Sequence, residues 1–233
     1  MINKKDEYRN FVSKHFPYSG LNNSDYGSII YSRVCENNLV TDIYKKYIEK
    51  QENDTKIYCN IRFLEAYKIG VNKILLYVPL NDYASINFCM RNIIENLLKF
   101  IYSIYFNCDF TTINKLSFRK IKDNFKDLKT TKFIDKDIID LFLSYYGHFS
   151  NSIHDKHSVT EKNLVFLEEI ITKNKVDLEK LDEQILNILN NYQVLICNIF
   201  KISRKNLSVA ESLRLKNALS NKRLEKVMGH FYG

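Results

Sequence analysis

A small group of polar side chains ends one of the most apolar stretches of the chain, and its spacing would suit acid–base chemistry. Ser150 and Asn151 precede His154 by four and three residues, so a helix would gather all three side chains at one of its ends. An imidazole titrates near pH ~6.5, which lets a histidine take or give a proton at neutral pH. His154 is therefore the candidate general base or acid. The alternative is an ordinary helix C-terminus, where Asn, Ser and His are common.

A pair of charged residues interrupts another apolar helical pattern. Arg91 and Glu95 lie four residues apart and therefore on one face of the helix. If this face meets the helix of His154, Arg91 would bind a phosphate or another anion, and Glu95 would hold the guanidinium in place. The alternative is a surface salt bridge worth less than ~1 kcal/mol.

The histidines near residue 150 do not have the spacing of a known metal site. His148, His154, Asp155 and His157 match neither the HExxH motif nor a paired Cys/His pattern. The glycines are too dispersed for a phosphate-binding loop or a nucleophile elbow. We therefore expect a site that uses neither a metal nor a cofactor.

The elements that would position these groups are helices. Gly (6) and Pro (2) are scarce and 45% of the residues are hydrophobic, which favours a globular core built from long helices. Apolar residues recur every three or four positions from Tyr83 to Phe106, and Asn81 or Asp82 is the expected N-cap. Further helices are predicted from Asp135 to about Ser152, from Ser158 through Ile171, from Asp177 through Ile199, and from Ser208 onward.

The first 80 residues have a weaker pattern. Val40 to Gln51 is expected to be helical, and residues 56–77 suit a helix, with a short strand over Val71 to Val78 as the alternative. The predicted fold class is all-α, a four- to five-helix bundle with N-terminal and C-terminal helical extensions. We expect a mostly helical region packed on the core (1–80), the bundle itself (81–203) and a basic helical extension (204–233).

The positive charge is concentrated in two segments. The formal net charge is +8. Residues 115–136 contain eight Lys or Arg and three Asp, and residues 201–226 contain eight Lys or Arg and two Glu. Each segment is either a solvated helix face or a phosphate-binding surface. The candidate RNA-binding residues are Arg119, Lys120, Lys122 and Lys126.

Composition also bears on the compartment. The five cysteines are scattered and form no CxxC pair, which indicates reduced side chains. The N-terminus lacks the apolar core of a signal peptide, and no apolar run approaches the ~18 residues of a membrane span. We therefore expect a cytoplasmic protein that does not bind a membrane.

Two segments resemble motifs of the HEPN superfamily (higher eukaryotes and prokaryotes nucleotide-binding), especially its divergent members in abortive-infection and other anti-phage systems. They are Arg91-Asn92-Ile93-Ile94-Glu95 and Tyr146-Gly147-His148-Phe149-Ser150-Asn151-Ser152-Ile153-His154. The resemblance covers residues 82–200, about half of the chain. It implies a HEPN-like bundle of four or five helices, usually dimeric, and in many members a metal-independent ribonuclease with an Arg, a polar residue and a His near the end of one helix.

One residue of the family pattern is absent. The slots for the family Arg hold Phe149, His148 and Gly147, so Arg91 or His148 would have to replace it. In the mechanism that the resemblance implies, His154 acts on the ribose 2′-hydroxyl or on the leaving oxygen. The remaining roles are charge stabilisation by Arg91, orientation of the phosphate by Ser150 and Asn151, and support of Arg91 by Glu95.

We therefore expect a HEPN-like ribonuclease effector in phage defence or in a toxin–antitoxin pair. Its expected partners are RNA, a second copy of the chain, and an antitoxin or another protein of a defence system. In the homodimer, the aromatic surface around Tyr145, Tyr146 and Phe149 is expected to form part of the interface. The alternatives are a catalytically inactive HEPN-like subunit that binds RNA, a nucleotide or a protein, and a plain helical scaffold.

Overall fold

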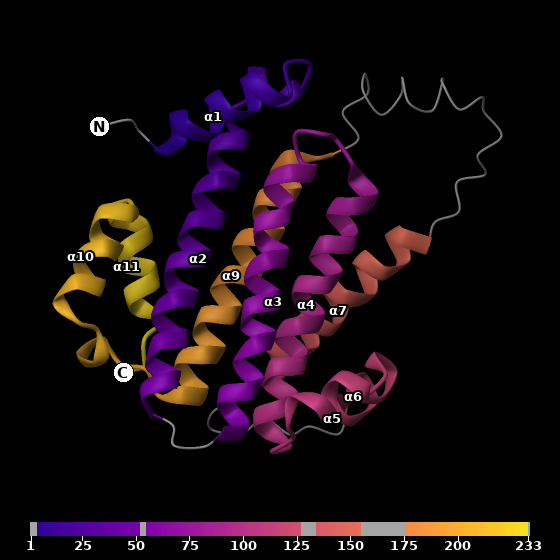
Figure 1. The fold of residues 1–233 in the computed structure, drawn as a ribbon, viewed down its shortest axis with the longest axis vertical. Helices are drawn as coiled ribbons and strands as arrows, with labels where there is room; N and C mark the ends of the chain where they lie inside the picture. The colour runs from indigo at the N-terminus through magenta and orange to yellow at the C-terminus, as the bar shows by residue number, and fades with distance from the viewer. Residues whose placement is uncertain (1–3, 52–54, 127–133, 155–175, 233) are drawn as a thin grey trace.

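The computed structural model describes residues 4–51, 55–126, 134–154 and 176–232 (Figure 1). In these ranges five long helices form a bundle: α2 (Tyr26–Gln51), α3 (Thr55–Tyr77), α4 (Tyr83–Tyr105), α7 (Lys136–His154) and α9 (Leu178–Phe200). The described residues form no β-strand, only an isolated bridge between Ser203 and Tyr232. The predicted all-α fold class is confirmed.

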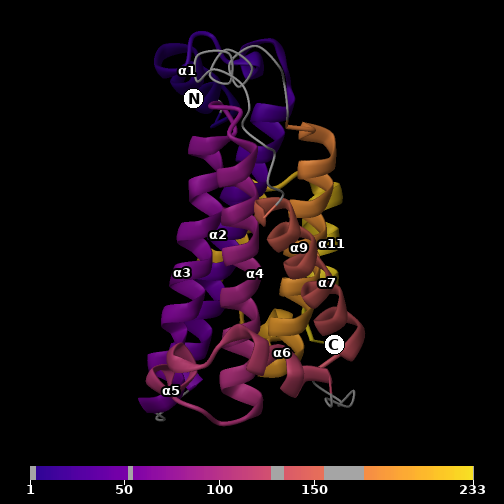
Figure 2. The ribbon, with the colours of Figure 1, turned by 90° about the vertical axis from the view of Figure 1, so that its right-hand side faces the viewer.

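The helices of the bundle are arranged so that α4 contacts both halves of the chain. α4 packs against α3 on one side and α7 on the other, while α2 packs against α3 and α9 (Figures 1 and 2). α7 crosses the bundle obliquely, and its start lies close to the short helix α6 (Phe118–Lys126). This crossing brings the middle of α7 against the first half of α4, where Arg91 lies.

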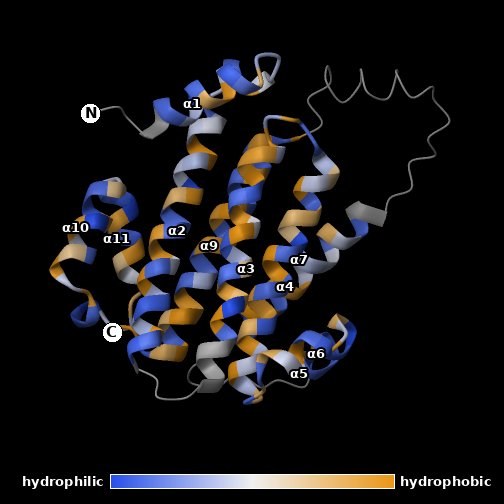
Figure 3. Cartoon of the chain, in the orientation of Figure 1, coloured by the Kyte–Doolittle hydropathy of each residue, from blue (hydrophilic) through white to orange (hydrophobic). Residues whose placement is uncertain are grey.

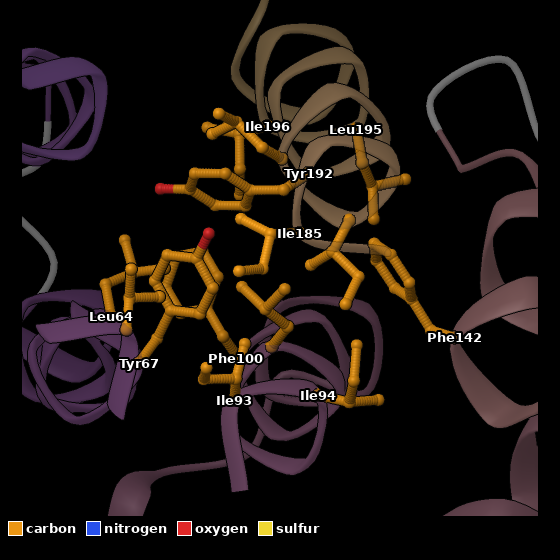
Figure 4. Close-up of a cluster of buried hydrophobic side chains, with 14 of the residues drawn as sticks. Leu64, Tyr67, Ile93, Ile94, Phe100, Phe142, Ile185, Tyr192, Leu195 and Ile196 are labelled. Carbon is orange, nitrogen blue, oxygen red and sulfur yellow. The ribbon is translucent and has the colours of Figure 1, made fainter. Parts of the chain in front are cut away.

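The apolar stripes of the long helices meet in one core (Figures 3 and 4). Its centre is formed by Tyr67 of α3, Ile93 of α4, Phe142 of α7 and Tyr192 of α9. α3 and α4 approach each other closely, because a Cβ added at Gly70 would lie 2.9 Å from Cγ1 of Ile93. Gly70 therefore allows α3 and α4 to pack at this short distance, because the Cβ of a larger residue would collide with Ile93.

Side-chain caps begin three of the helices at the predicted places. Asp82 caps α4 and Asp177 caps α9, each by accepting a backbone N–H in the first turn. Ser208 and Glu211 form the capping box of α10 (Val209–Ala218). These side chains satisfy backbone donors that a helix start leaves without partners.

The N-terminal half is more helical than its pattern indicated. Residues 71–78 do not form the strand considered as an alternative, because Val71, Ile74 and Val78 line the buried face of α3 and its C-terminal turn at helical spacing. The helix predicted from Val40 begins earlier, at Tyr26. The helix predicted from Ser158 lies outside the described residues.

Shorter helices surround the bundle: α1 (Lys4–His15), η1 (Gly20–Asn23), α5 (Phe110–Lys115), α6, η2 (Arg204–Asn206), α10 and α11 (Asn221–Gly229). α2 and α3 pack with the other long helices in the same core. None of the described helices is long and apolar enough to cross a bilayer.

A buried ion pair fastens the C-terminal helices to the bundle. Nε of Arg223 in α11 donates to both carboxylate oxygens of Glu36 in α2, at 2.7 and 2.8 Å. Nη1 of Arg223 donates to Oδ1 of Asn190 in α9 at 2.7 Å. Only 2% of the Glu36 side chain is exposed, so this carboxylate depends on Arg223 for its charge partner. Arg223 of the second basic segment, residues 201–226, therefore stabilises the fold.

Candidate functional site

The predicted acid–base residues lie together at the end of α7. Ser150, Asn151 and His154 all fall within its last turns, as their spacing predicts. Asn151 is exposed, whereas the hydroxyl of Ser150 is buried and has no hydrogen-bond partner. The side chain of His154 lies outside the described part of the structure. A buried hydroxyl without a partner is uncommon in a folded protein and marks this helix end as polar but not fully satisfied.

Arg91 is held by the helix of His154, one turn earlier than Ser150. Nε of Arg91 donates to the hydroxyl of Tyr146 at 3.1 Å, and the guanidinium carbon lies 5.1 Å from the centre of the same ring. The ring of Phe118 stacks on Tyr146, with centroids 3.6 Å apart and planes inclined by 20°. We name Phe118, Tyr146 and Arg91 the aromatic stack. It joins α6, α7 and α4 at one place.

Glu95 does not hold Arg91, contrary to the sequence-based expectation. Its carboxylate forms an ion pair with Nζ of Lys99, one turn further along α4, at 2.7 Å. The side chains of Glu95 and Lys99 are 22% and 14% exposed. The physical reason is that the π face and hydroxyl of Tyr146 attract the guanidinium, while Lys99 is an equally close cation for Glu95.

The four candidate RNA-binding cations share one helix. Arg119, Lys120, Lys122 and Lys126 are all exposed on α6. The opposite side of α6 is buried through Ile121 and Phe125. Of the four, only Lys126 forms an ion pair with a residue that the structure describes, its neighbour Asp123, at 2.8 Å.

The carboxylate within this helix reports its positive surroundings. The pKa of Asp123 is lowered, first by the hydrogen bond from Lys126 and then by the charges of Lys126, Arg119 and Lys122. Since Asp123 offsets one charge only, α6 keeps an excess of positive charge beside Phe118. Such a surface attracts phosphate groups.

The aromatic residues expected at a dimer interface also pack against neighbouring helices. Phe149 is 2% exposed, Tyr145 accepts a hydrogen bond from Asn187 of α9 at 2.9 Å, and Tyr146 is covered by Phe118. Tyr145 and Tyr146 are partly buried and Phe149 is buried, because α6, α7 and α9 use them for packing, and the homodimer stays a prediction.

A cavity of about 150 Å³ lies between the first turns of α4, the middle of α7 and the start of α9. Its lining residues are Tyr83, Ile86, Asn87, His148, Val176, Asp177, Lys180, Leu181 and Gln184. Asn87 is only 3% exposed, yet its amide nitrogen has no hydrogen-bond partner. Asn87 precedes Arg91 by one helical turn, so the cavity adjoins the aromatic stack.

Sequence reasoning missed Asn87 and Phe118. Asn87 occupies a position of the apolar stripe of α4, three residues before Met90 and seven before Ile94. A single amide at such a position predicts a buried polar group and could have been recognised in the sequence. Phe118 gave no comparable signal, because its contact with Tyr146 depends on how α6 docks beside α7.

The described residues contain no group of three or more His, Cys, Asp or Glu side chains that could hold a metal ion. A comparison of the chain with family models, with curated proteins and with solved structures finds no match. The groups available for chemistry at this site are the exposed cations of α6, the guanidinium of Arg91 on the ring of Tyr146, and the polar end of α7.

Proposed function

We propose that the protein binds single-stranded RNA on the face formed by α6 and α7 and cleaves it without a metal ion, as a HEPN-like effector of phage defence or of a toxin–antitoxin pair. The observation that carries this proposal is the aromatic stack, in which Arg91 lies on Tyr146 directly beside the cations of α6.

The binding part of the proposal follows from charge and shape. Lys and Arg bind RNA mainly by displacing counterions from its phosphates, and aromatic side chains bind unpaired bases by stacking. Arg119, Lys120 and Lys122 supply phosphate contacts, while the aromatic stack supplies a rigid wall beside them. Tyr146 binds only Nε of Arg91, and no other residue in the described ranges bonds to this guanidinium, so its two Nη groups can bind a phosphate.

The cleavage part rests on the resemblance and on the end of α7. His154 takes the proton of a ribose 2′-hydroxyl, whose oxygen attacks the adjacent phosphorus. The bond to the 5′-oxygen breaks, this oxygen takes up a proton, and a 2′,3′-cyclic phosphate is left. Arg91 offsets the negative charge that develops on the phosphate, and the exposed side chain of Asn151 orients it.

The second candidate is a subunit that binds RNA without cleaving it. Two observations favour it: Phe149, in a slot of the family Arg, is buried in the core, and Arg91 is already engaged by Tyr146. Production of a cyclic phosphate from a short RNA separates the two candidates. Toxicity on expression in a bacterial host, removed by His154→Ala, would favour the effector.

The experiment that tests RNA binding compares two charge reversals. The variant Lys120→Glu/Lys122→Glu alters α6, and Lys205→Glu/Lys216→Glu makes the same change on exposed residues of η2 and α10, across the bundle in Figure 1. We expect the affinity for a labelled single-stranded RNA to fall steeply with salt, and to fall about tenfold or more in the α6 variant only. Equal losses in both variants, or binding that ignores salt, would contradict the proposal.

A further inference from the structure

The cavity between α4, α7 and α9 contains an unsatisfied amide. Nδ2 of Asn87 has no hydrogen-bond partner, although only 3% of this residue is exposed. A buried amide nitrogen without an acceptor is costly and calls for a water molecule or a ligand. Since the amide oxygen and nitrogen can exchange places by a half-turn of the group, Asn87 can offer a donor, an acceptor, or both.

The size of the cavity limits what it can hold. Its volume of about 150 Å³ is well below the 300–1,000 Å³ of pockets for drug-sized molecules, and about that of an engineered cavity that takes up benzene. A single planar ring system therefore fits, whereas a whole nucleotide does not.

The charges around the cavity favour an uncharged group. Its lining contains one cation, Lys180, and one carboxylate, Asp177, which also caps α9. These charges offset each other, so the site is not built for an isolated phosphate. Tyr83 is 43% exposed and gives the cavity an aromatic side chain at the protein surface. An aromatic ring beside a paired donor and acceptor suits a nucleobase.

The position of the cavity connects it to the proposed RNA path. Asn87 lies one helical turn, about 6 Å, before Arg91 on α4. On α7, His148 lines the cavity two residues after Tyr146 of the aromatic stack. A strand whose phosphates contact α6 and Arg91 would thus bring its next base to the cavity.

We propose that this cavity receives one unstacked base of the bound RNA, with the amide of Asn87 pairing to the edge of the base and Tyr83 contacting its face. This inference rests on the proposed RNA-binding function. An asparagine amide forms two hydrogen bonds with adenine, to its N6 donor and its N7 acceptor, so adenine is the base that we assign to the cavity.

The test measures base preference with labelled homopolymeric RNAs of about eight nucleotides. Oligo(A), oligo(C) and oligo(U) are titrated into the full chain and into Asn87→Leu, which fills the cavity with an apolar side chain of similar size. Asn92→Ala, on the exposed side of the same helix, is the matched control. We expect oligo(A) to bind about tenfold more tightly than oligo(U), and this preference to vanish in Asn87→Leu while weaker binding through α6 persists.

The outcomes separate the two proposals. Binding of all three oligomers with equal affinity would overturn the base site and leave RNA binding in place. Binding of none would overturn the proposed function. The free nucleosides supply a second measurement: adenosine should raise the melting temperature of the wild-type chain but not of Asn87→Leu, and no stabilisation by any nucleoside would show that water alone occupies the cavity. Asn87→Ala, with a smaller side chain, replaces Asn87→Leu if circular dichroism shows that the latter does not fold.

Discussion

Arg91 donates its Nε hydrogen to the hydroxyl of Tyr146 at 3.1 Å and lies over the ring of the same residue. The contact joins the middle of α4 to α7 one turn before Ser150. It fixes the guanidinium through one nitrogen and one π face, which leaves two nitrogens for an anion. Tyr146, rather than the expected Glu95, is therefore the residue that positions Arg91.

Arg91→Ala should slow RNA cleavage by about 10²-fold, because it removes the charge that stabilises the phosphate during attack. Tyr146→Phe keeps the ring and loses only the hydroxyl, so the rate should fall about fivefold, the equivalent of one hydrogen bond worth ~1 kcal/mol. Single-turnover cleavage of a labelled RNA measures both effects, with Asn92→Ala as the control. An unchanged rate in Arg91→Ala would remove this residue from the mechanism.

His154→Ala should abolish cleavage while the protein stays folded. Loss of proton transfer alone slows such a reaction roughly 10²–10⁴-fold. Position 154 is the last residue of α7, so the stability cost should be on the order of 1 kcal/mol. His15→Ala, at an exposed position of α1, is the matched control. A purified His154→Ala protein with full activity would defeat the mechanism, and its unfolding would instead indicate a structural histidine.

The helices were predictable from sequence where periodicity and caps agreed. α4 and α9 each have an apolar residue every three or four positions and an Asp at the N-cap, and both begin where expected. Such helices can be predicted from sequence, because a capping side chain and an apolar stripe depend on residues that are only a few positions apart. α3 was ambiguous, since the apolar run of Val71 to Val78 suits a strand as well as a buried helix.

The candidate site was predictable only where its residues belong to the same helix. Ser150, Asn151 and His154 belong to the last turns of α7, as their spacing predicted, but spacing did not show that the Ser150 hydroxyl is buried while Asn151 is exposed. The partner of Arg91 was not predictable in this way. Glu95 and Tyr146 compete for the guanidinium, and which one wins depends on the crossing of α4 and α7, which no local pattern encodes.

Gly70 of α3 and Gly147 of α7 should respond to alanine in opposite directions. At Gly70 a new Cβ would meet Cγ1 of the buried Ile93 at 2.9 Å, so Gly70→Ala should destabilise the fold by about 1–3 kcal/mol. At Gly147 of α7 a Cβ would meet nothing within 4 Å. Gly147→Ala should therefore stabilise the fold by roughly 0.5–1 kcal/mol through helix propensity. Chemical denaturation measures both changes, and a stable Gly70→Ala would contradict the close approach of α3 and α4.

The stability of the protein should fall as the pH drops below the usual pKa of histidine, because of His230. Nδ1 of this side chain lies 2.8 Å from Oε1 of Gln193. Burial, followed by the charges of Arg223 and Lys226, lowers the pKa of His230 to about 4. The unfolded chain, with a histidine pKa near 6.5, then binds a proton at a higher pH than the folded chain does. The stabilisation is complete above pH 6.5 and is lost progressively toward pH 4.

Thermal denaturation between pH ~7 and ~4.5 measures this loss. In this range Glu211 contributes little to the change of stability with pH, because its pKa lies at about 2. Burial raises the pKa of this carboxyl, but the hydrogen bonds from Lys46 and Ser208 lower it more. That carboxylate therefore loses its stabilising effect below its usual value of 4.5. His230→Gln keeps a hydrogen-bonding side chain beside Gln193 and cannot titrate, so its melting temperature should depend less on pH in this range. His15→Ala, far from the C-terminal helices, should keep the wild-type slope. An identical slope in His230→Gln and in the wild type would contradict the assignment to His230.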